Sequence, residues 1–173
     1  ILPKTVYDRP VERPMHDGRV RIAIASSAMK IVPPFLRALK RIEERAPVPV
    51  EFHFFPNQTG LSHMLANKDL RRWFPNATIH PRAHYPMYVQ WLASCDSVCE
   101  TFPFGGTNSV IDCFSLGMPV VCWEGTQIHE KSDASMIRRV GLPENLIAHT
   151  VDEYVAIALR LMSDGGRELA RHR

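Results

Sequence analysis

The sequence of 173 residues has no long apolar run, no export signal and no block of like charges. No apolar stretch approaches the roughly eighteen residues that a membrane span needs, and the opening ILPKTVYDRP lacks the basic and apolar regions of a signal peptide. The formal net charge is only +3, and the basic clusters are short or interleaved with acids, as on an ordinary solvated surface. We therefore expect a cytoplasmic protein that neither inserts into a membrane nor binds nucleic acid.

Cysteine is scarce and is not arranged in pairs. Cys95, Cys99, Cys113 and Cys122 lie inside apolar segments, and no two of them form a C-x-x-C motif. This pattern differs from that of a small disulfide-rich secreted domain. We expect four buried free thiols in a reducing compartment.

Three phosphate-binding signatures are missing. No G-x-G-x-x-G follows the first apolar segment, which disfavours NAD or FAD, and the absence of G-x-x-x-x-G-K-[ST] excludes the P-loop kinases and ATPases. The sequence also lacks an Asp-x-Asp pair, which many metal-dependent sugar transferases use to hold a divalent ion. If the ligand of this protein carries a diphosphate, we therefore expect that group to be bound without a metal or another cofactor. A lysine, backbone amides and a helix dipole would supply the positive potential.

What the sequence does contain is an alternation of short apolar segments with amphipathic ones. VRIAIAS at 20–26 is typical of a parallel strand covered on both faces, and 33–46 places Phe35, Leu39 and Ile42 on one helical stripe. Further strands are expected at 48–56, 77–81, 96–102, 118–125 and 145–150, and further helices at 60–74, 85–95, 107–117, between 125 and 145, and at 151–162. This order predicts an α/β fold with a doubly wound, Rossmann-like parallel sheet.

The domain boundaries follow from proline. Pro3, Pro10 and Pro14 lie among charged residues, so residues 1–18 are expected to form an extended leader or linker. Residues 19–173 would form one domain, and a chain of this length can bury a substantial core. Because the sequence opens without Met, we expect it to be a piece of a longer polypeptide.

One loop before an expected helix combines residues that suit an anion. In FGGTNSVID, Gly105 and Gly106 permit a close backbone approach, and Thr107 or Asn108 can cap the helix. Backbone amides and the helix dipole favour a phosphate there, and Asp112, one turn along, could accept hydrogen bonds from a ribose diol. A glycine-rich turn with an ordinary cap and an exposed acid would give the same residues, so both interpretations stay open.

A second polar corner follows the first expected strand. SSAMK places the hydroxyls of Ser26 and Ser27 and the ammonium of Lys30 before the helix that starts at Pro33. In a parallel sheet the ends of such strands lie along one edge, so Lys30 could reach a diphosphate at the FGGTNSVID loop. The alternative is an ordinary surface lysine.

Histidines mark a third corner, IHPRAHY. His80 follows a short strand and could contact a base or a phosphate, or it could be a structural histidine with satisfied hydrogen bonds. His80 and His84 have a spacing that zinc could use, but Pro81 and the lack of nearby cysteine or carboxylate ligands disfavour a metal site. His129 could face the site, but is more simply explained as part of a helix surface.

These three corners, in this order, resemble the C-terminal lobe of a GT-B glycosyltransferase. The similar family comprises the O-GlcNAc transferases and the bacterial cytoplasmic N-glycosyltransferases that modify adhesins (HMW1C-like), and the bacterial branch is the more similar. The resemblance rests on IASSAMK, on HP near 80, on TFPFGGTNSVIDCFSLGMPVV and on GTQIHEKSDASMIRRVGLPENLIAHTVDEYVAIALRL. It covers residues 20 to about 162, and the long C-terminal block makes it specific.

The resemblance implies a UDP-sugar site in residues 19–173. The lysine near the diphosphate in that family matches Lys30, the hydroxyl residue before it matches Ser27, and the histidine by the uracil or ribose matches His80. The Thr-Asn pair at the phosphate-binding helix and the ribose-binding acid match Thr107, Asn108 and Asp112. Two departures are visible.

Gly106, which the resemblance includes in the UDP-sugar site, stands where relatives usually have a polar residue. HPRAHYP is also one residue longer than the matching loop, which affects the region of His84. Both differences lie within the corners that carry the resemblance.

The activity implied by the resemblance is the inverting, metal-independent transfer of a hexose or N-acetylhexosamine from UDP to a protein Asn, Ser or Thr side chain. This chain would supply the donor half. The acceptor side and the general base would belong to an N-terminal lobe outside it, so the fragment alone would be inactive. The alternatives are a UDP-sugar epimerase lobe, which would turn over its donor without a peptide, and a non-catalytic nucleotide-binding or partner-binding module.

Overall fold

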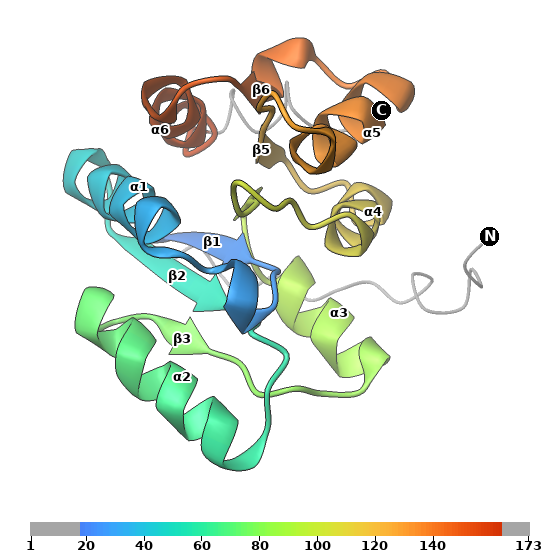
Figure 1. Cartoon of the computed structure of the whole chain (residues 1–173). Helices are drawn as coiled ribbons and strands as arrows, with labels where there is room; N and C mark the ends of the chain where they lie inside the picture. The colour runs from blue at the N-terminus through green and yellow to red at the C-terminus, as the bar shows by residue number, and fades with distance from the viewer. Residues whose placement is uncertain (1–17, 164–173) are drawn as a thin grey trace.

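The computed structural model describes residues 18–163, so nearly all of the predicted leader lies outside the described range. Its centre is a parallel sheet of six strands in the order β3-β2-β1-β4-β5-β6 (Figure 1). The strands are β1 (Val20–Ile24), β2 (Val50–Phe54), β3 (Thr78–Ile79), β4 (Ser97–Cys99), β5 (Val120–Trp123) and β6 (Ile147–Ala148). The predicted doubly wound, Rossmann-like sheet is confirmed.

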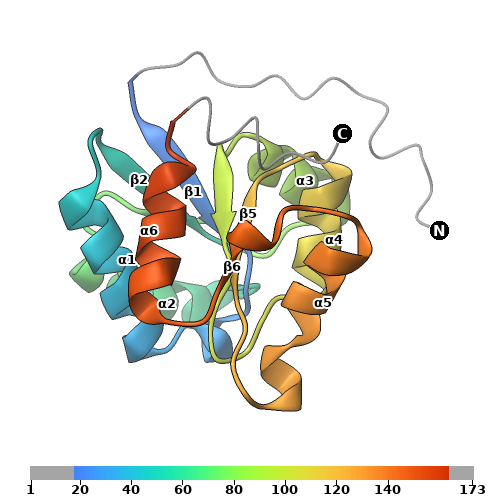
Figure 2. The same cartoon turned by 90° about the horizontal axis from the view of Figure 1, so that it is seen from above.

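In the described part of the chain, six α-helices cover both faces of this sheet. They are α1 (Pro33–Arg45), α2 (Gly60–Trp73), α3 (Tyr85–Ala93), α4 (Asn108–Ser115), α5 (Ser132–Arg139) and α6 (Val151–Arg160). Figure 2 shows α1, α2 and α6 on one side of the strands and α3, α4 and α5 on the other. Within residues 18–163 no helix has the length and apolarity that crossing a bilayer would require.

The central strand β1 is buried because helices cover both of its faces. Its side chains Ile22 and Ile24 have no exposed surface, as expected for an apolar strand of a parallel sheet. Residue Ile22 pairs with Phe52 of β2 on one side and with Ser97 of β4 on the other. The strand order therefore reverses at β1, and this reversal opens a crevice beyond the carboxyl ends of β1 and β4.

The core on the α1 side is built around aromatic rings. The ring of Phe35 from α1 lies edge-on to Phe102, with centroids 5.4 Å apart, and Tyr154 from α6 packs edge-on against both. Such edge-to-face pairs add about 0.5–1.5 kcal/mol each to the burial of their area. They fix α6 beside α1.

A second apolar cluster fills the opposite face, between α3, α4 and the sheet. Cys95 and Cys113 pack there with Leu92 and Val98, and Cys99 and Cys122 lie in the strands. All four thiols are buried and free, as the sequence predicts. Close packing of α3 and α4 on this face brings the loops at their N-termini together.

The structure differs from the predicted elements mainly near residue 130. One helix is expected before residue 145, but three short helices form: the 3-10 turn η3 (Ile128–Glu130), α5, and the 3-10 turn η4 (Glu144–Leu146). Gln127 and Glu130 form a reciprocal capping box around η3. This capping box starts η3 after Gln127, and α5 begins separately at Ser132.

Candidate functional site

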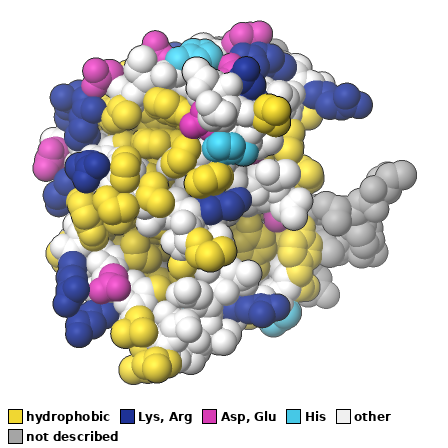
Figure 3. Space-filling view, viewed as in Figure 1, with side chains coloured by type: hydrophobic (Ala, Val, Ile, Leu, Met, Phe, Trp, Pro, Cys, Tyr) yellow, Lys and Arg dark blue, Asp and Glu magenta, His cyan; other side chains and the backbone are white. Residues whose placement is uncertain are grey.

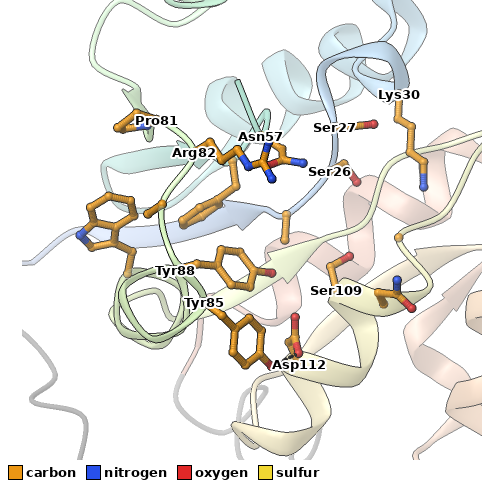
Figure 4. Close-up of a pocket in the computed structure, with 16 residues that line it drawn as sticks. Ser26, Ser27, Lys30, Asn57, Pro81, Arg82, Tyr85, Tyr88, Ser109 and Asp112 are labelled. Atoms are coloured by element: carbon orange, nitrogen blue, oxygen red, sulfur yellow. Dashed lines mark hydrogen bonds between the residues drawn. The ribbon is translucent and has the colours of Figure 1, made fainter. Parts of the chain in front are cut away.

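A cavity of about 490 Å³ lies at the carboxyl ends of the strands, where the strand order reverses. Its size falls within the usual range for small-molecule sites. The segments after β1, β2 and β3 and the loop before α4 all contribute to it (Figure 4). The lining residues are Ala25, Ser26, Ser27, Lys30, Phe55, Asn57, Pro81, Arg82, Ala83, Tyr85, Tyr88, Trp91, Gly106, Asn108, Ser109 and Asp112.

One side of the cavity, here called the polar wall, is formed by Ser27, Lys30 and the loop 104–109. Lys30 ends the 3-10 turn η2 (Ala28–Lys30), and its Nζ donates a 2.5 Å hydrogen bond to the carbonyl oxygen of Gly105. Figure 4 shows the Lys30 side chain crossing from η2 toward this loop. The ammonium therefore joins two corners that are 75 residues apart in the sequence.

The loop before α4 is held by a carboxylate of its own chain. The buried side chain of Asp133, from α5, accepts hydrogen bonds from the amides of Gly106 (2.8 Å) and Thr107 (3.0 Å) and from the hydroxyl of Ser132 (3.1 Å). We expected the amides of this loop to be available to a phosphate. The amides of Gly106 and Thr107 are already hydrogen-bonded to the Asp133 carboxylate, so a ligand would have to use the amides from Asn108 onward.

Both glycines of the loop are required by close neighbours. A Cβ added at Gly105 would lie 2.0 Å from a carboxylate oxygen of Asp133, and one at Gly106 would lie 2.1 Å from the Ser109 hydroxyl oxygen. Thr107 follows with φ of +51°, a rare conformation for a β-branched residue. Strained backbone of this kind concentrates at ligand-binding sites.

Thr107 occupies the N-cap position of α4, but its side chain makes no capping hydrogen bond. Asn108, exposed at the first turn, lines the cavity instead. The N-terminus of α4, with its dipole and its first-turn amides that have no partner within the helix, therefore borders the same cavity as Lys30. An anionic group fits this end of the cavity.

Asp112 lies deeper in the cavity on the same helix. It is 9% exposed, and the hydroxyl of Tyr85 donates a 2.5 Å hydrogen bond to its Oδ1 (Figure 4). Tyr85 starts α3, so this bond connects the two helices across the cavity. A carboxylate held in this way can accept hydrogen bonds from a diol.

The other side of the cavity, here called the aromatic wall, consists of Phe55, Tyr85, Tyr88 and Trp91. Tyr85 and Tyr88 are one turn apart on α3, with ring centroids 6.1 Å apart, and Tyr88 packs edge-on against Phe55. Figure 4 shows the labelled tyrosines directed into the cavity. Such rings offer flat apolar surface for a planar ligand.

His80 does not line this cavity. Its ring is stacked behind Phe55, with centroids 4.4 Å apart, and its Nε2 forms a 3.0 Å hydrogen bond with Nδ1 of the buried His53. Burial is the main cause that lowers the pKa of His80 to about 4, and the neighbouring His53 adds to the shift. A neutral histidine packed in this way supports the aromatic wall from behind.

Five of the seven predicted site residues therefore line one cavity, namely Ser27, Lys30, Gly106, Asn108 and Asp112. Thr107 lies in the loop beside it and His80 lies behind its wall. Of the other histidines, His129 stacks on the exposed Phe104, and His84 is the exposed residue before α3. Neither of the two lines the cavity.

Asp133 and the aromatic wall are not predicted from the sequence. Asp133 is 21 residues beyond Asp112 and lies on a separate helix, so no local pattern connects it with the loop. The spacing of Tyr85, Tyr88 and Trp91 at three-residue intervals was a usable signal, since it places three large rings on one helical face.

Comparison with known proteins identifies related sequences. Over 156 residues the chain is 44% identical to the UDP-glucose:protein N-beta-glucosyltransferase of Actinobacillus pleuropneumoniae, a match that covers 89% of this chain and 25% of that protein. Over 77 residues it is 35% identical to a Solanum lycopersicum protein named "Probable UDP-N-acetylglucosamine--peptide N-acetylglucosaminyltransferase SPINDLY", covering 44% of this chain and 8% of that protein. The chain thus spans about a quarter of its bacterial relative. No protein-family model matches it.

Solved structures show the same fold. A mutant form of the Thermobaculum terrenum O-GlcNAc transferase superposes with a TM-score of 0.79 at 22% identity, covering 94% of this chain and 32% of that one. The glycosyltransferase WaaG, involved in lipopolysaccharide biosynthesis, superposes with a TM-score of 0.60 at 10% identity, covering 90% and 42%. Together with the sequence relatives, these confirm the predicted resemblance and the fold of one GT-B lobe.

Proposed function

Because this chain is a homologue of UDP-sugar-dependent protein glycosyltransferases and has the fold of a GT-B lobe, we propose that it is the donor-binding part of such an enzyme. The observation that carries the proposal is the bond between Lys30 and the Gly105 carbonyl, which joins the two predicted diphosphate corners in one cavity. The bacterial relative is named for UDP-glucose and a protein acceptor. We infer a UDP-hexose or UDP-N-acetylhexosamine donor for this chain.

The polar wall would hold the diphosphate. Lys30 lies within reach of the first turn of α4, and an ammonium beside open helix amides attracts phosphate oxygens. One charge-assisted hydrogen bond contributes about 1.5–3 kcal/mol. Ser27 and Asn108 line the same end and would add hydrogen bonds, while Thr107 shapes the loop.

The opposite end of the cavity would hold the uridine. Asp112, oriented by Tyr85, would accept hydrogen bonds from the ribose hydroxyls. The uracil would lie against the aromatic wall, where a flat ring can stack. In this arrangement His80 contributes by fixing Phe55 and does not contact the base directly.

The chemical contribution of this chain would be to stabilise UDP as it leaves. Negative charge grows on the β-phosphate during an inverting displacement, and Lys30 with the α4 dipole would offset that charge without a metal. The surface that binds the acceptor protein and the general base would lie outside this chain, in an N-terminal lobe of the same polypeptide. We place the reaction in the cytoplasm, and propose neither membrane insertion nor nucleic-acid binding.

Figure 3 is consistent with a small anionic ligand rather than a polyanion. On this face the Lys and Arg side chains alternate with acidic ones around the edge, and no broad basic patch covers it. A nucleic-acid surface would gather its basic side chains along one stripe.

Titration calorimetry of the 173-residue chain with UDP tests the proposal. We expect binding at millimolar UDP or below, and Lys30→Ala should weaken it about tenfold to a hundredfold because one charged hydrogen bond is lost. Lys40→Ala is the matched control, since Lys40 pairs with Glu43 on α1 outside the cavity. A folded wild-type chain that binds no UDP would contradict the proposal.

A further inference from the structure

A carboxyl group is buried directly beneath the polar wall. Glu100, the residue after β4, has no exposed surface, and its Oε1 lies 3.3 Å from the Ser109 hydroxyl oxygen, within hydrogen-bond distance. Its other oxygen, Oε2, has no hydrogen-bond partner among the described residues. Its backbone carbonyl is fixed by the hydroxyl of Tyr154, which donates a 2.7 Å hydrogen bond.

The carboxyl group is pressed against the loop that borders the cavity. A Cβ added at Gly106 would lie 2.2 Å from Glu100 Oε2 and 2.1 Å from the Ser109 hydroxyl oxygen. Ser109 itself lines the cavity beside Lys30 and Asn108. Glu100 is therefore separated from the diphosphate end of the cavity by a single hydroxyl group.

Glu100 has two charged neighbours, Asp133 and Lys30, and several neutral titratable ones. Burial and the negative charge of Asp133 raise the pKa of Glu100 to about 8, against the smaller opposing effects of the Ser109 hydrogen bond and of Lys30. The other titratable neighbours have pKa values raised by burial and stay uncharged near neutral pH: Tyr88, Tyr154, Cys99, Cys113 and Cys122. Glu100 is thus mostly neutral at pH 7.

We propose that Glu100 is a positioning residue of the diphosphate site, which in its neutral form donates a hydrogen bond to Ser109 Oγ and so directs the Ser109 proton toward the ligand. The inference rests on the proposed function. A hydroxyl has one proton to donate. When Glu100 is ionised its carboxylate accepts a hydrogen bond from the Ser109 hydroxyl, and Ser109 then presents only lone pairs to the phosphate oxygens.

Ionised Glu100 also adds a third carboxylate near the site, beside Asp133 and Asp112. Binding of UDP should therefore favour the protonated form and should weaken as the pH rises through the pKa of Glu100. If the neutral form alone is competent, the affinity falls with the neutral fraction, which drops about tenfold from pH 7 to pH 9.

The experiment is a UDP titration of the 173-residue chain between pH 6.5 and pH 9, comparing wild type with Glu100→Gln. We expect the wild-type affinity to fall about tenfold across pH 7 to 9, because the neutral fraction of Glu100 falls by that factor. Glu100→Gln should bind at pH 7 and keep its affinity, since its amide donates to Ser109 at every pH. Glu43→Gln, on α1, is the control and should follow wild type.

Ser109→Ala separates an effect through the hydroxyl from an effect of charge alone. We expect it to bind more weakly at pH 7 and to lose most of the pH dependence. A second readout needs no variant: in buffers of different ionisation enthalpy at pH 8.5, UDP binding to wild type should take up more than about half a proton.

Parallel pH profiles for wild type and Glu100→Gln, or no proton uptake by wild type, would overturn this role of Glu100. An absence of UDP binding at pH 7 in every variant would instead overturn the proposed function itself.

Discussion

The two walls of the cavity are built by different physical means. The polar wall is a strained loop, held by hydrogen bonds from Lys30 and to Asp133 and unable to accept a side chain at Gly105 or Gly106. The aromatic wall is a helix face and a strand end, held by ring packing among Phe55, Tyr88 and their neighbours. The polar wall depends on a few charged contacts, and the aromatic wall depends on apolar packing shared among many atoms.

This difference predicts how each wall responds to change. A single lost charged contact should disturb the polar wall strongly, because buried amides and carboxylates are costly to leave unpaired. The aromatic wall should tolerate single polar changes, since its packing is distributed over several rings. Substitutions in each wall therefore test this difference.

The largest effect should come from Asp133→Ala. The change leaves the amides of Gly106 and Thr107 without their partner and releases the loop before α4. We expect UDP affinity to fall by about a hundredfold or more and the free energy of unfolding to drop by about 3 kcal/mol, the cost of losing charge-assisted hydrogen bonds. Calorimetry and thermal unfolding measure the two effects.

Asp133→Asn keeps an acceptor oxygen and should lie between wild type and Asp133→Ala in both measurements. Asp69→Ala, at an exposed position on α2, should change neither. Wild-type UDP binding by Asp133→Ala would show that the loop keeps its shape without the carboxylate, and the contrast between the walls would then fail.

The sequence predicts much of the polar wall because its chemistry is local. Gly105, Gly106 and Asn108 fall within four residues, and the alternation of strands and helices places Lys30 along the same edge. The partner that holds the loop could not be predicted in the same way. Which carboxylate reaches two particular amides is decided by where α5 packs, which no local pattern encodes.

The second largest effect should come from Tyr85→Phe, in the part of the aromatic wall that contacts Asp112. Removing the hydroxyl deletes the 2.5 Å hydrogen bond to Asp112 Oδ1 while keeping the ring. We expect UDP affinity to fall about threefold to tenfold, from the loss of one hydrogen bond to a charged group that is only partly compensated by water. Titration calorimetry provides the measurement.

The same variant can be tested with 2′,3′-dideoxy-UDP, which has no ribose diol. If Tyr85 acts by orienting Asp112 for the ribose, the variant and wild type should bind this analogue with nearly equal affinity. An equal loss for UDP and the dideoxy analogue would mean that Tyr85 contributes to the general shape of the aromatic wall instead.

The aromatic wall was harder to predict because rings at helical spacing usually belong to a core. Tyr85, Tyr88 and Trp91 line a cavity here, together with Pro81, Arg82 and Ala83 of the loop before α3. His80 is the opposite case, a predicted site residue that does not line the cavity. The sequence offers both a ligand contact and a structural role, and the ring is stacked behind Phe55, away from the cavity surface.

The smallest effect on binding should come from His80→Gln. Because the ring does not line the cavity, we expect UDP affinity to change less than about threefold, equivalent to less than about 0.7 kcal/mol.

The stability of the folded chain in acid should respond to His80→Gln instead. The pKa of His80 is lowered to about 4 by burial, below its ordinary value near 6.5, so the unfolded chain binds a proton that the folded chain resists. Wild type should therefore lose stability as the pH falls from about 6.5 toward 4, and melting temperatures at pH 7 and pH 5 should differ less in the variant. A tenfold loss of UDP affinity with an unchanged acid profile would restore the predicted ligand contact and place a histidine in the aromatic wall.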